Sequence, residues 1–284
     1  MEKAGTIYRQ LRIARNLTQK DVSDGFFSPT GVSEFENNNR EIGYETLYEL
    51  LRRINVTSAE FQHAIQGYKA DDFNILLRDI NKFYYAQDIP NLKSLLEKEQ
   101  AKKKICNQEL TCLMIKIMLS EIDVKTAVEE YEKRKIINHL LDLPRWGYYE
   151  LVLFSNSMGI FEKSTLKLLS KDIMSRSQFY QEIPHNRKMI IAVLMNVMNI
   201  FIRQDEFVQA LKIKREIEQL LGTEDTHDRV ILLFLTGMLE FDIGETEKGI
   251  AKMQSAINVF ETVGNASLAD FYRATLESII ANQK

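Results

Sequence analysis

The apolar residues near the start of the chain recur at helical spacing, with short polar breaks between them. Ile7, Leu11 and Ala14 follow the i, i+4, i+7 rule of one helical face, which predicts a helix over residues 5–15. Thr18 and Ser28 stand where N-caps of two further helices are expected, since their hydroxyls accept early backbone N–H groups. Pro29 suits the first turn after Ser28, because its missing N–H costs nothing there.

Two more short helices complete this opening region. The run Asn37-Asn38-Asn39 is expected to end the helix that starts at Ser28, because asparagine tolerates the left-handed conformation and competes for backbone hydrogen bonds. The apolar spacing then predicts helices over residues 46–54 and 58–65. Five short helices in about 65 residues predict a small helical domain.

After Gly67 the pattern changes to longer amphipathic helices. The segment "FNILLRDINKFYYAQDIPNLKSLLEKEQ" predicts two helices that turn at residues 88–90, since proline ends one helix and can begin the next. A final helix is expected over residues 267–282.

Small residues late in the chain resemble the tetratricopeptide pattern. In "LTGMLEFDIGETEKGIAKMQSAINVF", small side chains recur where two helices would touch, at Gly237, Gly244, Gly249 and Ala256, with Met253 between them. A weaker copy sets Ala210 against Gly249 at an offset of 39 residues. We therefore expect degenerate helical repeats stacked into a solenoid with a concave face.

Composition supports an all-α chain of two domains. The 284 residues include 12 Gly and only 4 Pro, too few for the many turns of a β-rich protein. Apolar residues at 45% and charged residues at 27% indicate a folded globular chain. The predicted boundaries are 1–66 for the small helical domain and 67–284 for the α-solenoid.

The cysteines and the apolar segments indicate where the protein resides. Cys106 and Cys112 lie on one apolar helical run, which makes a disulfide framework improbable and favours a reducing compartment. No secretory signal opens the chain. The most apolar window, residues 189–202, is too short for a membrane span and contains two asparagines. We expect a cytoplasmic protein without a membrane segment.

The motifs "LTQKDV", "VSEFENN" and "TLYELLRRINV" resemble the lambda-repressor-like (XRE-type) helix-turn-helix family. The resemblance implies that the helix starting at Ser28 enters the DNA major groove. Members often carry Gln or Arg where this chain has Pro29 and Thr30, and Asn38 replaces a turn glycine. Matched by position, Pro29, Thr30, Ser33 and Glu34 fall where bases are read, and Gln19 and Arg40 fall where phosphates are held. The basic residues near Gln19, Arg12 and Arg15, and the cap residue Ser28 complete the set that we expect on DNA. The alternative is a helical module that serves only packing.

Polar residues among apolar ones are the candidates for holding a ligand in the solenoid. Asn196 and Asn199 lie three apart on one helical face, and Asn156 stands in "LFSNSMGIF". Side-chain amides can bond an extended peptide backbone, and Arg187 is a further candidate. Equally, each amide could satisfy a neighbouring helix turn, since buried polar groups must be hydrogen-bonded. The cluster Trp146, Tyr148 and Tyr149 would line a pocket or pack between helices.

With its XRE-type head and the segments "WGYYELVLFSN" and "LMNVMNIFI", the chain resembles the Rgg/MutR family of transcription regulators over nearly its full length. The resemblance implies a homodimer on promoter double-stranded DNA. In many members a short signalling peptide binds in the helical-repeat groove, and the same is expected here.

The sequence offers no catalytic site. Its four histidines, at positions 63, 139, 185 and 227, match no zinc motif, and neither a phosphate-binding loop nor a nucleophile elbow is present. We therefore expect no enzyme activity, metal or cofactor. The alternative to a regulator is a scaffold whose repeats bind a partner protein, with the head used for packing or dimerisation.

Overall fold

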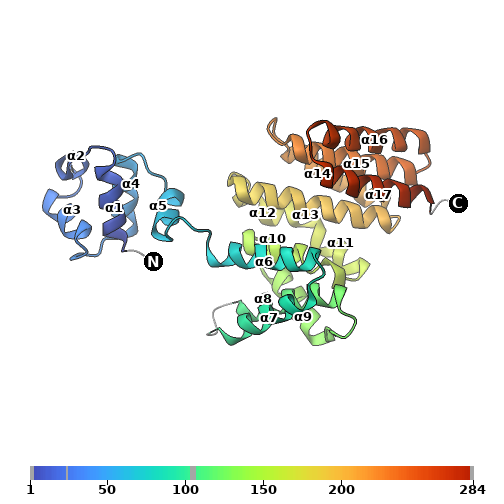
Figure 1. Ribbon diagram of the computed structural model, residues 1–284, viewed down its shortest axis with the longest axis horizontal. Coiled ribbons are helices and arrows are strands. Elements are labelled where there is room, and N and C mark those ends of the chain that lie inside the picture. The colour runs from blue at the N-terminus through green and yellow to red at the C-terminus, as the bar shows by residue number, and fades with distance from the viewer. Residues whose placement is uncertain (1–2, 24, 103–106, 282–284) are drawn as a thin grey trace. The chain divides into compact units, whose positions relative to one another are not determined.

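The computed structural model describes residues 3–23, 25–102 and 107–281, and within these ranges the chain forms helices and loops without a strand (Figure 1). Contacts divide it into two compact units, Met1–Ala86 and Gln87–Lys284. The predicted all-α fold is confirmed. The helices of the first unit are α1 (Ala4–Ile13), α2 (Gln19–Ser23), α3 (Pro29–Glu36), α4 (Tyr44–Arg53), α5 (Ser58–Ile65) and α6 (Asp72–Tyr85).

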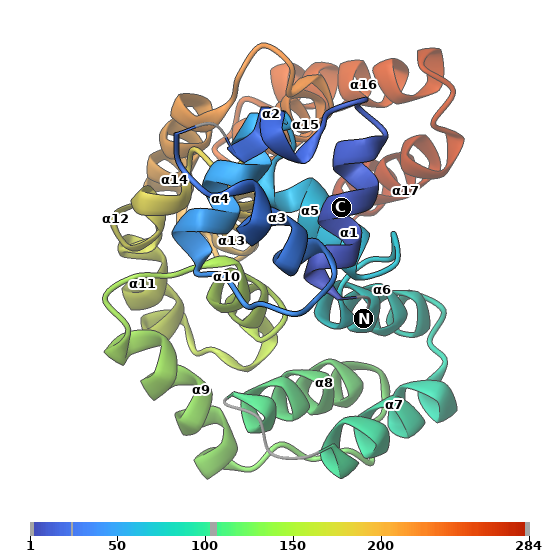
Figure 2. The same ribbon diagram turned by 90° about the vertical axis from the view of Figure 1, so that its left-hand side faces the viewer.

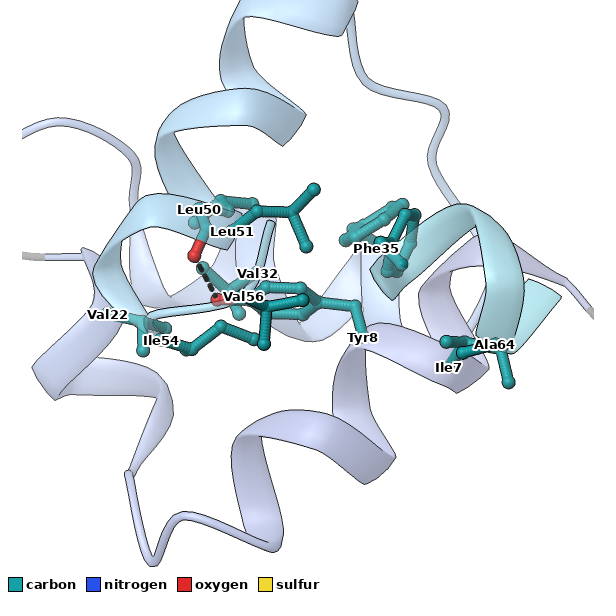
Figure 3. Close-up of a cluster of buried hydrophobic side chains, with 11 residues drawn as sticks. Ile7, Tyr8, Val22, Val32, Phe35, Leu50, Leu51, Ile54, Val56 and Ala64 are labelled. Carbon is teal, nitrogen blue, oxygen red and sulfur yellow. Dashed lines mark hydrogen bonds between the residues drawn. The ribbon is translucent and has the colours of Figure 1, made fainter. Parts of the chain in front are cut away.

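The core of the first unit is built around the ring of Tyr8 (Figure 3). This ring is fully buried, lies 5.7 Å from the ring of Phe35, and donates its hydroxyl to the Leu50 carbonyl at 3.4 Å. Burial raises the pKa of Tyr8 above its ordinary value. Side chains packed in this core run from Ala4 to Ile65, so α1 to α5 share one core.

The helix ends of the head follow the predicted chemistry. The Thr18 hydroxyl accepts the Asp21 backbone N–H at 3.2 Å, while the Asp21 carboxylate accepts the Thr18 N–H at 2.7 Å. Asn38, expected at a helix stop, has a left-handed φ of 60°. Its side-chain amide donates to the Thr6 hydroxyl at 2.8 Å, which gives asparagine a contact that a turn glycine would lack.

The second unit is a longer series of helices. Asp88 caps its first helix by accepting the Asn91 N–H at 3.2 Å, so the chain breaks where Pro90 predicted. The elements are α7 (Ile89–Ala101), α8 (Gln108–Ile122), α9 (Glu130–Asp142), α10 (Tyr148–Ser155), η1 (Met158–Ile160), α11 (Lys163–Lys171), α12 (Ile173–Ser177), η2 (Gln178–Tyr180), α13 (Pro184–Arg203), α14 (Phe207–Leu220), α15 (Thr226–Asp242), α16 (Thr246–Thr262) and α17 (Ala266–Ala281).

Successive helices of this unit pack as hairpins. Helix α7 lies beside α8, and the pairs α13–α14 and α15–α16 follow, with α17 against α16 (Figures 1 and 2). Trp146 of the predicted aromatic cluster serves packing here. Trp146 is fully buried, its ring lies 5.4 Å from that of Phe154, and its Nε1 donates to the Leu140 carbonyl at 3.0 Å.

Two glycines set the distance between α15 and α16. A Cβ on Gly237 would stand 2.7 Å from the Gly249 carbonyl oxygen, and a Cβ on Gly249 would stand 2.6 Å from the Gly237 oxygen. The two backbones therefore touch, with Met253 and Ala256 buried beside them. The small-residue pattern correctly predicted this contact for Gly237 and Gly249, and Ala210 is fully buried in α14, as the weaker copy predicted. The prediction was wrong for Gly244, which lies in the turn between α15 and α16 with a φ of 99°, where a Cβ would meet no described atom within 4 Å.

Replacing Gly249 with alanine tests this contact. The added methyl group would have to separate two backbones, so we expect a loss of about 1–3 kcal/mol of stability. Denaturant unfolding followed by circular dichroism measures the change. The control is Ser255→Ala, because Ser255 is exposed on the same helix and its hydroxyl donates to the Ala251 carbonyl of that helix. Equal unfolding midpoints for Gly249→Ala and the unmodified chain would contradict the close approach.

Candidate functional site

Helix α3 forms as its sequence predicts. The Ser28 hydroxyl accepts the Gly31 N–H at 2.9 Å, and Pro29 occupies the first turn. A side chain on residue 31 would strike the Phe27 ring, because a Cβ there would lie 2.8 Å from it. Val32 and Phe35 are buried in the head core and anchor the helix.

The opposite side of α3 is open to solvent. Ser28, Pro29, Thr30 and Glu34 are exposed, and Ser33 is partly exposed. Because Val32 and Phe35 hold the other side in the core, the edge predicted to read bases is free to meet a partner. We call the exposed side chains of Pro29, Thr30, Ser33 and Glu34 the reading edge.

Arg12 does not belong to this surface. Its guanidinium forms two bonds to the Glu36 carboxylate, Nε–Oε1 at 2.6 Å and Nη2–Oε2 at 2.8 Å, and also donates to the Leu17 carbonyl. The two side chains are only 8% and 0% exposed. The hydrogen bond to Glu36 is the largest cause that raises the pKa of Arg12. The expectation that Arg12 contacts DNA is wrong, because the guanidinium is used inside the head.

Gln19 joins the same network. Its side-chain amide donates to Oε2 of Glu36 at 2.8 Å, so it links the start of α2 to the end of α3. The helical spacing of the sequence already indicated that Arg12 and Glu36 are buried. Arg12 follows the buried Tyr8 by four residues, and Glu36 follows the buried Val32 by four, so both charges face the core.

Other cations of the head remain at the surface. Arg15 is exposed in the turn after α1 and donates to the Leu11 carbonyl of that helix at 3.0 Å. Arg40 lies 3.4 Å from Glu34, with both side chains about half exposed, and its guanidinium stands 5.1 Å from the Phe27 ring centre. An exposed pair of this kind is weak, so Arg40 can exchange Glu34 for a phosphate.

In the second unit the structure assigns Arg187 a different role from the expected one. Its guanidinium donates to the Leu220 carbonyl at 3.0 Å, and it pairs with Asp225 and with Glu224, the latter at 2.7 Å. The Asp225 side chain is 1% exposed, and the hydrogen bond from Arg187 lowers its pKa. Arg187 thus fastens the start of α13 to the turn between α14 and α15. The prediction that it binds ligand is wrong, because protein acceptors take its donors.

The three candidate amides differ in what they contact. Asn156 donates to the Val152 carbonyl of its own helix at 2.8 Å, which is the helix-turn alternative. Asn196 is exposed on α13 and donates to the Ser155 hydroxyl at 3.3 Å. Asn199 is partly exposed, and its Oδ1 accepts Nε of Arg203 at 3.3 Å.

Ser155, Asn196, Asn199 and Arg203 form what we call the polar stripe. The three α13 members recur every three or four residues, so they share one helical face. At its Arg203 end the stripe borders a cavity of about 320 Å³ whose other lining residues are Phe271, Ala274, Thr275, Ser278 and Ile279 of α17. Sequence reasoning missed Arg203, although it continues the Asn196–Asn199 spacing by one turn.

Two remaining predictions from the sequence concern the cysteines and a membrane span. Cys106 lies outside the described residues, and Cys112 is a partly buried free thiol whose pKa is raised, mainly by burial. No helix within residues 3–281 that the structure describes is long and apolar enough to cross a bilayer.

Two protein families match this chain, one in each unit. The family described as the HTH-type transcriptional regulator Rgg, C-terminal domain, matches residues 92–274, more than half of the chain. This protein belongs to the Rgg family. A second family, described as helix-turn-helix, matches residues 9–61 and includes the whole reading edge. The chain is therefore a transcription regulator with a DNA-binding head and not an enzyme, and the scaffold alternative is set aside.

Solved structures with the same fold span both units of this Rgg-family regulator. The Streptococcus dysgalactiae SHP pheromone receptor Rgg2 is 25% identical, with a TM-score of 0.85 over 97% of this chain and 99% of that one. A transcriptional regulator from Listeria monocytogenes EGD-e has a TM-score of 0.89 at 20% identity, covering 99% and 98% of the two chains. The PrgX/iCF10 complex gives 0.74 at 18% identity over 100% and 98%. The latter two show the shared fold.

Substituting Arg12 tests its role in this Rgg-family head. Arg12→Ala leaves the Glu36 carboxylate buried without its cation, which costs about 3–5 kcal/mol. We expect the head to lose protection in hydrogen exchange, whereas Arg15→Ala, which removes an exposed arginine from the same turn, leaves it unchanged. The double variant Arg12→Met/Glu36→Leu should recover most of the stability. Normal protection in Arg12→Ala with a loss of DNA affinity alone would restore the phosphate role.

Proposed function

We propose that this Rgg-family regulator acts in the cytoplasm as a homodimer that binds promoter double-stranded DNA through the reading edge of α3. An open edge on a helix held by Val32 and Phe35 supports this assignment. Helix-turn-helix dimers place two such helices about 34 Å apart, one turn of DNA, so a two-fold dimer meets both half-sites. Arg15 and Arg40 would then contact phosphates, which fix position without reading sequence.

The reading edge suggests a modest set of base contacts. Glu34 is the one charged group on it and can accept from a cytosine amino group, while the Thr30 methyl suits the methyl of thymine. Pro29 offers no hydrogen bond. Specificity would therefore rest on few direct contacts together with the shape of the DNA.

We further propose that a short peptide binds along the polar stripe and controls the regulator. The observation that carries this proposal is the pair Asn196, which is exposed, and Asn199, which is partly exposed, on one face of α13, since neither is used to close a helix end. Side-chain amides can donate to and accept from an extended backbone at once. The S. dysgalactiae relative is described as a pheromone receptor, and another structure of the same fold is described as a bacterial peptide pheromone/receptor complex, which supports a peptide ligand.

Substitutions at the reading edge test DNA recognition. Duplexes selected from random DNA by the full chain serve as probes in fluorescence anisotropy at two salt concentrations. Thr30→Ala and Glu34→Ala should each weaken binding to the selected sequence by about tenfold, the loss of one base contact. Binding to unselected DNA should change far less, since phosphates dominate it. Ser255→Ala is the control, and unchanged affinities in both edge variants would argue against the reading edge.

The peptide proposal is tested with a synthetic library of apolar octapeptides and the full-length protein. Peptides retained by the protein are identified by mass spectrometry, and their affinities are measured by calorimetry. The double variant Asn196→Ala/Asn199→Ala should weaken binding by at least about tenfold, through lost hydrogen bonds, with little change in melting temperature. Asn258→Ala, an exposed asparagine on α16, is the matched control. A library from which nothing is retained would refute the proposal.

A further inference from the structure

Arg203 is the cation at the end of the polar stripe, and within the described residues it forms no ion pair. It is the last residue of α13, it is exposed, and its Nε bonds only the neutral Asn199 amide at 3.3 Å. Among the residues that the structure describes, no carboxylate lies within 4.0 Å of its guanidinium. By contrast, Arg187 at the other end of the same helix has two acidic partners.

One acid, Asp242, interacts with Arg203 electrostatically without forming an ion pair of 4.0 Å or less in the part of the chain that the structure describes. Asp242 has its pKa raised by burial and by the neighbouring Asp205, with Arg203 opposing the rise. This pattern describes an arginine near enough to influence Asp242 but not paired with it. The hydrogen bond of Arg203 to Asn199 uses Nε, and the residue lines the cavity between α13 and α17.

The α17 wall of that cavity carries both apolar side chains and hydroxyl groups. Phe271 is 62% exposed, and Ile279 and Ala274 add further apolar surface. Thr275 and Ser278 supply hydroxyls at the same wall. A cation facing hydroxyls and a large exposed aromatic ring suits a ligand that carries an anionic group and an apolar side chain on the same small unit.

The distance along α13 from Asn196 to Arg203 matches a few residues of an extended peptide. Asn196 and Arg203 are seven residues apart, so they lie about 10 Å apart along the helix axis. An extended peptide covers about three residues in that distance. A peptide backbone bonded to Asn196 would therefore bring a residue about three positions further along the peptide to Arg203.

We infer that Arg203 binds the C-terminal carboxylate of the peptide, with the side chain of its last residue apolar and seated against Phe271 and Ile279. The inference rests on the proposed peptide function and adds the direction of the ligand, whose carboxyl end points from α10 toward α17. A carboxylate suits the planar fork of arginine, which can donate two parallel hydrogen bonds. A lysine in the same place would supply charge without that geometry.

The test compares one octapeptide library made in two forms, with free carboxylates and as C-terminal amides. Both are presented to the full-length protein, and retained peptides are measured individually by calorimetry. We expect the free acids to bind at least about tenfold more tightly than their amides, the scale of a charge-assisted hydrogen bond. Retained sequences should end in an apolar residue.

Variants assign the effect to Arg203. Arg203→Gln should abolish the difference between acid and amide, and Arg203→Lys should restore part of it. Arg215→Gln, which removes an exposed arginine of α14 away from the stripe, should preserve the difference in full. Phe271→Ala should weaken both forms alike, since it removes apolar contact and not charge.

The outcomes separate the inference from the function on which it rests. Tight binding of amides and acids alike, or an undiminished preference for acids in Arg203→Gln, would overturn the carboxylate assignment while leaving peptide binding intact. Failure to retain any peptide in either form would refute the proposed peptide function and this inference together. Melting curves of each variant identify any loss of binding that comes from unfolding.

Discussion

A guanidinium and a carboxylate with almost no access to water join three helices of the DNA-binding head. Arg12 comes from α1 and Glu36 from the end of α3, and the amide of Gln19 brings in the start of α2. Removing either charge would strand the other in a medium of low polarity, so the pair constrains where α3 can lie. The exposed edge of α3 has a defined orientation because its buried side is held by this bond as well as by Val32 and Phe35.

In the second unit, one arginine is paired with acidic groups of the protein and another is free to bind a ligand. Arg187 and Arg203 stand near opposite ends of α13. Arg187 is committed to Asp225, Glu224 and a carbonyl, and so fastens a helix to a turn. In the part of the chain that the structure describes, Arg203 has only a neutral amide as its hydrogen-bond partner, and it borders a cavity. Residue type alone does not distinguish the two, because the difference lies in what the fold brings beside each one.

Control of a regulator by a ligand requires that the ligand bind two arrangements of the protein with different affinity. A helix such as α13 suits this requirement, since it carries the exposed amides of the polar stripe and packs along α14 and α15. Close backbone contacts such as that of Gly237 with Gly249 make the later hairpins stiff, because tightly packed helices shift as units and do not deform gradually. A change at the stripe would then reach the neighbouring helices of its unit.

The sequence by itself determined the local features of this protein. The caps at Thr18 and Ser28, the stop at Asn38 and the glycine contact between α15 and α16 depend on residues close in the chain or on small side chains, whose preferences are strong. The motifs of the head and the central segments indicated the Rgg family, which the comparison confirmed. The open edge of α3 also followed from its helical spacing.

Only the tertiary structure decided which polar side chains remain available for a partner. Arg12 and Arg187 were expected at binding surfaces, yet Glu36 and Asp225 occupy them from 24 and 38 positions away in the chain. Asn156 bonds a carbonyl of its own helix, whereas Asn196 and Asn199 lie on an accessible face of α13. Arg203 continues that face and lines a cavity with α17. Such pairings depend on distances between helices, and helical periodicity gives the face of a residue but not the group that meets it.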